Sequence, residues 1–239
     1  MELHVYKDGD ALSKAAAEWI SRRIAGTLSA KPRFTIALSG GNTPKRLHRL
    51  LSQPPYRDRI DWARMHVFWG DERAVPFNDP RNNARMAFDT LLDLVPIPPG
   101  QIHIMKTDRK PEQSAAEYEQ LLREYFDGAH TSFDLVLLGL GDNAHTLSLF
   151  PGEPVVHEEK AWAKAFFLRE QDMYRITLTR PIVNKAAAVL FLTEGASKAP
   201  ALKEVLEGDY NPDLYPAQVI KPVGELLWFV DEAAAAELK

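Results

Sequence analysis

One histidine, His145, follows a buried-type strand pattern and a glycine-bearing turn, an arrangement that could deliver a general base. Segment 134–138 is a nearly continuous apolar run, and Gly139 and Gly141 follow it before the histidine. Such a run is typical of a parallel strand covered on both faces. Ligands of open α/β sheets bind outside the carboxyl ends of the strands, where an imidazole can take a proton from water near neutral pH. A lone histidine in a turn can also be purely structural.

The residues around His145 favour a base that acts on water. Asn143, Thr146 and Ser148 supply amide and hydroxyl groups that could fix the tautomer of the ring. The chain has no Gly-x-Ser-x-Gly nucleophile elbow and no His-Glu-x-x-His pattern, and its other histidines lack metal-ligand spacing. We therefore expect neither a covalent nucleophile of that type nor a metal site.

A second glycine turn could bind an anion. Ser39-Gly40-Gly41-Asn42-Thr43-Pro44 connects a short strand pattern to a helix pattern. Backbone N–H groups at a helix N-terminus attract phosphate, and we expect Thr43 as the N-cap with Pro44 at the first helical position. The segment lacks the endings of a nucleotide P-loop and of a dinucleotide fingerprint, so neither ATP nor NAD is indicated. The alternative is that the two glycines only make a tight turn.

Several cations stand at predicted strand or helix ends. Arg73 follows Asp71 and Glu72, whose carboxylates could orient its guanidinium for bidentate phosphate binding. Arg175 opens a predicted strand, and Lys198 starts a predicted helix. Taken one at a time, each could equally be a solvated surface charge or part of a surface ion pair.

Composition limits the possible partners. The chain has 239 residues, 45% hydrophobic residues, a formal net charge of −4 and no cysteine. These values predict one domain over residues 1–239, no nucleic-acid partner, no disulfide and no cysteine nucleophile. The N-terminus lacks the pattern of a signal peptide, and no apolar run is long enough to span a membrane, so we expect a cytoplasmic protein.

Strand and helix patterns alternate almost throughout the chain. The predicted strands after the short N-terminal one cover residues 34–38, 65–69, 101–105, 134–138, 163–168, 175–179, 186–192 and 225–230. The first predicted helix has Asp10 as its N-cap. The other predicted helices cover residues 44–51, 82–94, 112–126, 198–206 and 232–238. This alternation predicts an α/β fold with a doubly wound, mostly parallel sheet and helices on both faces.

Five motifs in this order resemble those of the bacterial and eukaryotic 6-phosphogluconolactonases. The C-terminal segments 215–217 and 227–231 also resemble that family. The five motifs are residues 39–44, 69–76 with Asn82 and Asn83, 139–152, 175–179 with Asn184, and 195–198.

The resemblance implies a Rossmann-like sheet, shared with glucosamine-6-phosphate deaminases, and hydrolysis of 6-phospho-D-glucono-1,5-lactone in the pentose phosphate pathway. It implies no cofactor and a small sugar-phosphate lactone as the partner. It makes His145 the general base, with Arg73 and Lys198 on the phosphate and backbone N–H groups of segment 139–144 facing the carbonyl oxygen. The expected substrate- and phosphate-binding set is Ser39, Gly40, Gly41, Asn42, Thr43, Asp71, Arg73, Gly141, Asn143, Arg175 and Lys198.

One departure from the family pattern leaves alternatives open. Most members compared have Asp-Gly before the histidine, where this chain has Asn143 and Ala144, and Asp142 could compensate for the missing acid. A catalytically silent sugar-phosphate-binding protein is one alternative. A deaminase-like isomerase is another, but it needs acids where this chain has Asn143 and Phe150. The sequence does not indicate the oligomeric state.

Overall fold

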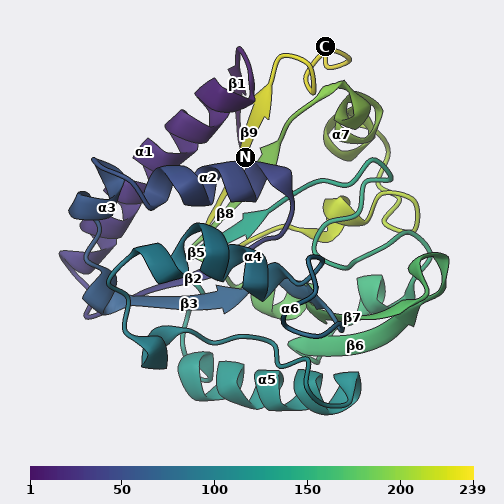
Figure 1. Cartoon of the computed structure of the whole chain (residues 1–239). Coiled ribbons are helices and arrows are strands. Elements are labelled where there is room, and N and C mark those ends of the chain that lie inside the picture. Colours follow the sequence, from purple (N-terminus) through teal and green to yellow (C-terminus); the bar gives the residue numbers. More distant parts are fainter.

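A six-stranded parallel sheet forms the centre of the molecule (Figure 1). The computed structural model describes all residues, 1–239. Every neighbouring pair in this sheet is parallel, as the continuous apolar strand patterns predict. In spatial order the strands are β1 (Glu2–Tyr6), β9 (Glu225–Asp231), β8 (Ala188–Thr193), β5 (Leu135–Leu138), β2 (Phe34–Leu38) and β3 (Met65–Trp69).

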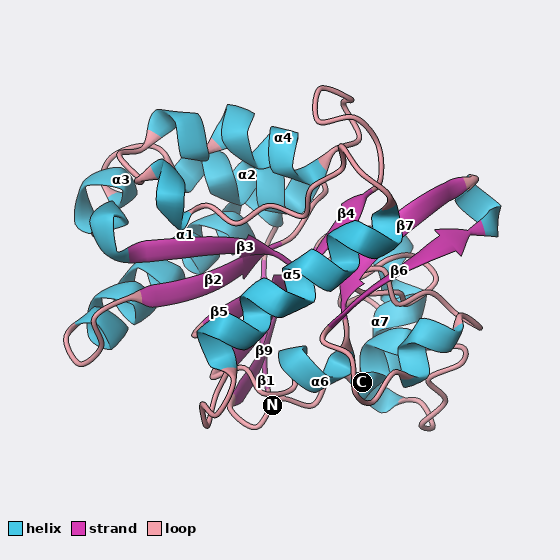
Figure 2. Ribbon diagram, turned by 90° about the horizontal axis from the view of Figure 1, so that it is seen from below, coloured by secondary structure: helices cyan, strands magenta, loops and turns pink.

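Helices cover both faces of this sheet (Figure 2). A separate apolar core fills each face. Helices α1, α2 and α4 pack on one face, whereas α5 and α7 pack on the other. This confirms the predicted doubly wound α/β fold. The helices are α1 (Gly9–Leu28), α2 (Asn42–Leu51), α3 (Tyr56–Arg59), α4 (Asn83–Thr90), α5 (Pro111–Phe126), α6 (Arg180–Val183) and α7 (Ala199–Glu207). None of these helices is long and apolar enough to cross a lipid bilayer.

A second sheet was not predicted. It has three antiparallel strands in the order β4 (Asp71–Arg73), β7 (Met173–Leu178) and β6 (Ala163–Leu168). The strands predicted at 163–168 and 175–179 therefore lie outside the parallel sheet. Gly70 makes the transition, because its N–H donates to Leu38 of β2 while its carbonyl accepts from Leu178 of β7.

Local capping differs from the prediction at two helices. Asp8, not Asp10, caps α1, and its side chain accepts a hydrogen bond from the Ala11 N–H. Gly41, not Thr43, is the N-cap of α2, with φ of 103°, a conformation that glycine adopts without strain. Helix α2 therefore begins at Asn42, before the proline.

Two predicted elements are absent from the structure. Segment 101–105 follows a 3-10 turn at Pro99–Gln101 and makes only one isolated bridge, between Ile102 and Val67. Segment 232–238 forms turns rather than a helix, because the local hydrogen bonds along its backbone are isolated ones, from the Ala235 N–H to Asp231 O and from the Leu238 N–H to Ala235 O.

The strand order creates a switch point between β2 and β5. From β2 the chain proceeds to β3 on one side, and it later returns to β5 on the other side of β2. The connections that follow β2 and β5 therefore leave the sheet in opposite directions, and a crevice opens between them. These connections carry the two glycine turns singled out from the sequence.

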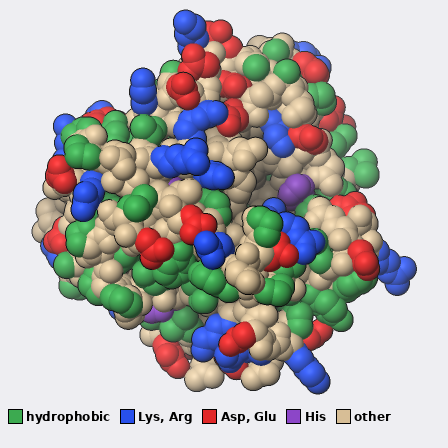
Figure 3. Space-filling model, in the orientation of Figure 1, with side chains coloured by type: hydrophobic (Ala, Val, Ile, Leu, Met, Phe, Trp, Pro, Cys, Tyr) green, Lys and Arg blue, Asp and Glu red, His purple; other side chains and the backbone are tan.

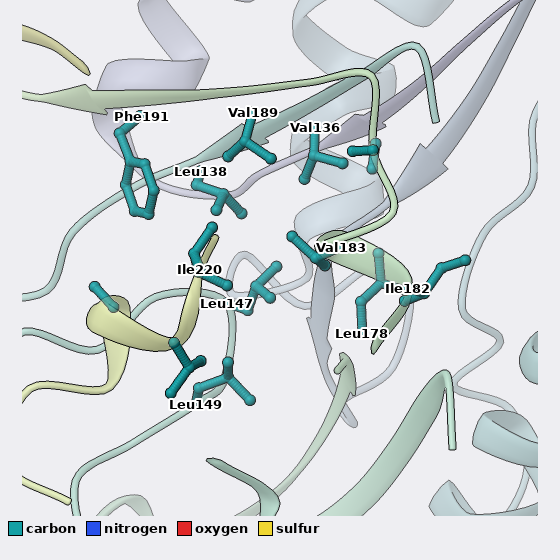
Figure 4. Packing of buried hydrophobic residues seen from close by; sticks show 14 of the residues in the cluster. Val136, Leu138, Leu147, Leu149, Leu178, Ile182, Val183, Val189, Phe191 and Ile220 are labelled. Atoms are coloured by element: carbon teal, nitrogen blue, oxygen red, sulfur yellow. The ribbon is translucent and has the colours of Figure 1, made fainter. Parts of the chain in front are cut away.

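The apolar core anchors the connection that follows β5. Leu147 and Leu149 are buried in the same apolar cluster as Leu138, Val189 and Val183, and Figure 4 shows Leu147 near Leu138, Val183 and Ile220. Each such buried leucine contributes about 1.5–3 kcal/mol through the hydrophobic effect. The turn that bears His145 is therefore anchored in the apolar core by the residues that follow it.

Glu72 attaches helix α4 to strand β4. Its fully buried carboxylate accepts hydrogen bonds from the N–H groups of Arg73 at 2.8 Å, Asn83 at 2.7 Å and Ala84 at 2.8 Å. Burial raises the pKa of Glu72 to about 7, against the effect of these three donors. The position of Asn83 beside the crevice depends on this carboxylate.

Replacement of Glu72 by glutamine at pH 8 is expected to lower the free energy of unfolding by about 2–3 kcal/mol, because an amide NH2 must then face at least one buried N–H donor. Urea denaturation measures this change. Glu112→Gln is the matched control: Glu112 is an exposed acid in the first turn of α5, and its loss should change stability by less than about 0.5 kcal/mol. Equal effects of the two substitutions would show that Glu72 does not hold α4.

Candidate active site

Most of the predicted site residues gather around one cleft at the carboxyl ends of the parallel strands. The cleft has a volume of about 190 Å³. Figure 3 shows a hollow near the middle of this face, with histidine, basic and acidic side chains around it. The cleft is lined by Ser39, Gly40, Gly41, Asp71, Arg73, Asn83, Gly139, Leu140, Gly141, His145, Thr146, Leu147, Arg175 and Lys198.

The imidazole of His145 is held on three sides. Its ring stacks on Phe150 at a centroid distance of 4.1 Å, and its Nδ1 lies 2.6 Å from Oδ1 of Asn143. A Cβ atom at Gly141 would lie only 2.0 Å from Nδ1, so the ring edge packs directly on this glycine backbone. These contacts leave Nε2 as the nitrogen available to the cleft.

The environment of His145 keeps its ring neutral at physiological pH. Burial is the main cause that lowers the pKa of His145 to about 4; Asp71 opposes this effect, and the cations of the cleft add to it. A neutral imidazole has one nitrogen free to accept a proton.

The turn before His145 closes around an alanine at the position where the resemblance implied glycine. Ala144 has φ of 62°, in the left-handed region. This conformation costs an alanine roughly 1–2 kcal/mol. The turn is closed by hydrogen bonds from the Ala144 N–H to Gly141 O and from the Gly141 N–H to His145 O. Ala144 therefore takes the backbone conformation for which glycine is usually chosen.

A buried ion pair forms the floor of the cleft. Nη2 of Arg175 lies 2.9 Å from Oδ2 of Asp71, and Oγ of Ser148 lies 2.6 Å from the same oxygen. The remaining guanidinium nitrogens donate to Ser148 and Gln171. Burial would raise the pKa of Asp71, but Arg175, Arg73 and the Ser148 hydroxyl hold it below its usual value. All three guanidinium nitrogens of Arg175 are thus occupied by protein groups.

Arg73 lies opposite Arg175 in the β4–β7 pair. Its Nη1 donates to the carbonyl of Arg81 at 2.8 Å, and its buried Nε has no partner. Arg73 is therefore a cation with unused hydrogen-bonding capacity beside the cleft. Like charges on directly opposed residues repel each other, so an anion bound near both arginines would relieve this repulsion.

Asn83 connects Arg73's strand to the first glycine turn. Its Nδ2 donates to the carbonyl of Asp71 at 2.9 Å. A Cβ atom at Gly40 would lie 2.0 Å from Oδ1 of Asn83, so only glycine allows this approach. The turn 39–41 is thereby held against strand β4.

Lys198 reaches the cleft from the 3-10 turn Ala196–Lys198 that precedes α7. Its Nζ lies 2.6 Å from Oδ1 of Asp142, which also accepts from Oγ of Ser197. The hydrogen bond from Lys198 is the largest of the influences that lower the pKa of Asp142. Asp142 is hydrogen-bonded to these groups and not to His145, so the structure does not support compensation by Asp142 for the missing family acid.

Three of the predicted residues do not line the cleft. Asn42 and Thr43 lie in the first turn of α2 behind Gly41, where no side chain caps the helix. Asn143 contacts the cleft only through His145. Gly41, the N-cap of α2, does line the cleft, so the helix begins at the edge of the site.

Sequence reasoning missed Asn83 and Ser148 as site residues. Asn83 was visible as part of a motif, but only the structure shows that it packs against Gly40. Ser148 was considered for the tautomer of His145; instead it bonds to Asp71 and Arg175.

Comparisons with known proteins agree with the resemblance. The family model described as glucosamine-6-phosphate isomerases/6-phosphogluconolactonase matches residues 7–228. A 6-phosphogluconolactonase of Synechocystis is 42% identical over 95% of this chain and 94% of the relative. A 6-phosphogluconolactonase of Nostoc is 41% identical over 99% of this chain and 98% of the relative.

Solved structures agree with this result. The 6-phosphogluconolactonase of Trypanosoma brucei superposes with a TM-score of 0.88 at 26% identity, covering 100% of this chain and 98% of that one. This chain therefore belongs to the family of glucosamine-6-phosphate isomerases and 6-phosphogluconolactonases.

Proposed function

We propose that the protein is a 6-phosphogluconolactonase, which hydrolyses 6-phospho-D-glucono-1,5-lactone to 6-phospho-D-gluconate. The observation that carries the proposal is the position of His145, a neutral imidazole with its Nε2 free in a cleft that also holds Arg73 and Lys198. The relatives at 41–42% identity carry the same activity in their names. A cytoplasmic location fits the cysteine-free composition and forms part of the proposal.

The substrate phosphate is bound by Arg73, Lys198 and the start of α2. A phosphate monoester carries about −1.5 to −2 charges at pH 7. Charge-assisted hydrogen bonds from guanidinium and ammonium groups are roughly twice as strong as neutral ones, and the helix N-terminus adds about half a positive charge. Arg175 is buried and already donates three hydrogen bonds to protein groups, so it contributes mainly its positive charge.

His145 then acts as the base. Its Nε2 takes a proton from water while the water oxygen attacks the lactone carbonyl carbon. The ring C–O bond breaks, and the imidazolium returns the proton to the leaving oxygen. The phosphate dianion favours the protonated ring, so bound substrate raises the basicity of His145.

Backbone N–H groups stabilise the negative charge that develops on the carbonyl oxygen. Gly141 and Ala144 are not available, because their N–H groups bond within the turn. Of the other four residues in segment 139–144, only Gly139 and Leu140 line the cleft, and we assign this role to their N–H groups.

Two other activities fit the site less well. A silent binding protein would require a misplaced base, whereas the ring of His145 is stacked and hydrogen-bonded. A deaminase would require a carboxylate in place of Phe150, whose ring instead packs on the imidazole.

His145→Ala should lower kcat by about 10²–10⁴-fold, because the general base is lost while the phosphate contacts remain. The assay follows disappearance of the lactone generated in situ, corrected for spontaneous hydrolysis, and calorimetry measures the binding of 6-phosphogluconate. His130→Ala, at an exposed histidine, is the control and should be fully active. Binding of 6-phosphogluconate without any acceleration by the wild type would instead indicate the silent binding protein.

Lys198→Ala should raise KM by about 10- to 100-fold with a smaller effect on kcat, since a charge-assisted hydrogen bond contributes about 1.5–3 kcal/mol. Steady-state kinetics over a range of lactone concentrations separate the two constants. Lys203→Ala, on α7 but away from the cleft, is the matched control. A fall in kcat at unchanged KM would contradict a role in phosphate binding.

A further inference from the structure

The side chain of Asn143 has a fixed orientation. Its Oδ1 lies 3.3 Å from the backbone nitrogen of His145 and 2.6 Å from the ring Nδ1 of the same residue. The backbone N–H can only donate, so the amide atom facing it must be the oxygen. An amide oxygen carries no proton, and therefore the ring Nδ1 must be the protonated nitrogen.

We propose that Asn143 is a positioning residue that holds His145 in the tautomer with Nδ1 protonated and Nε2 free, and that its neutral amide keeps the ring unprotonated in mildly acidic solution. The proposal rests on the proposed function, since it concerns the base of that reaction. The resemblance implies an aspartate at position 143, where this chain has asparagine. The amide of Asn143 orients the ring as a carboxylate would, but without the negative charge.

The surroundings of the ring support a base that stays neutral. The charged groups facing it are Asp71 and Arg73 of β4, Arg175 of β7, Lys198 before α7, and Asp142 of its own turn. Asp71 is paired with Arg175 and Asp142 with Lys198, so no carboxylate hydrogen-bonds to the imidazole. Consistent with this arrangement, burial lowers the pKa of His145 to about 4.

The first test is NMR titration of the ligand-free protein, with His145→Gln used to assign the ring signals. The ring 15N shifts should show Nδ1 protonated and Nε2 unprotonated at pH 7, and the ring should remain neutral down to pH about 5.5. Asn143→Asp should raise the pKa of His145 by about 1–3 units, because a carboxylate beside Nδ1–H favours the imidazolium. Asn211→Asp adds the same charge at an exposed loop position and should leave the His145 titration unchanged.

The second test is the pH dependence of kcat/KM. The second ionisation of the substrate phosphate, near pH 6, affects all variants equally. A difference between variants therefore reports the ionisation of His145. Because Asn143→Asp raises the pKa of His145, its acidic limb should lie at higher pH than that of the wild type. Asn143→Ala should lower kcat by about 10–100-fold, the size of effect seen when a metal-bound histidine loses the partner that orients it.

A protonated Nε2 in the wild type, or an unchanged titration of His145 in Asn143→Asp, would overturn the proposal. Because NMR does not depend on turnover, absence of lactonase activity with the expected tautomer would count against the proposed function alone.

Discussion

The buried contact between Asp71 and Arg175 is the interaction on which the site depends. Oδ2 of Asp71 accepts from Nη2 of Arg175 and from Oγ of Ser148, while the main chain of Asp71 accepts from Asn83. These contacts join the second sheet, the connection that bears His145 and the start of α4 at one residue, Asp71. Loss of one partner from such a buried pair typically costs about 3–5 kcal/mol, because the other charge is left uncompensated.

Because Arg175 is paired with Asp71, the two arginines beside the cleft differ in how far they can bind a ligand. Arg175 is 3% exposed and each of its three guanidinium nitrogens donates one hydrogen bond to a protein group, so its main task is to neutralise Asp71. Arg73, directly opposite, donates only one hydrogen bond to a main-chain carbonyl and keeps its remaining donors. Two arginines that look equivalent in the sequence thus have different tasks in the proposed reaction, one in holding the floor and one in binding an anion.

The sequence predicted the parts of the site that depend on local pattern. The turns at 39–41 and 139–145 were visible because glycines interrupt apolar runs, and parallel strands bring such turns to one edge of a sheet. The contact between Asp71 and Arg175 was not visible, since the two lie 104 positions apart in the chain and the second sheet that pairs them was not predicted. The orientation of Asn143 was also hidden, because it depends on Ala144 adopting φ of 62°.

The charges of the cleft couple phosphate binding to the basicity of His145. Without substrate, burial and, to a smaller extent, the positive charges of Lys198 and the two arginines disfavour protonation of the ring. In the proposed reaction a phosphate dianion offsets these charges, so the ring becomes a stronger base only when a phosphorylated substrate is bound. A lactone without the phosphate would lose both the binding contacts and this rise in basicity. Selection for the phosphorylated substrate therefore acts on the chemical step as well as on binding, in a protein whose net charge of −4 gives no general attraction for anions.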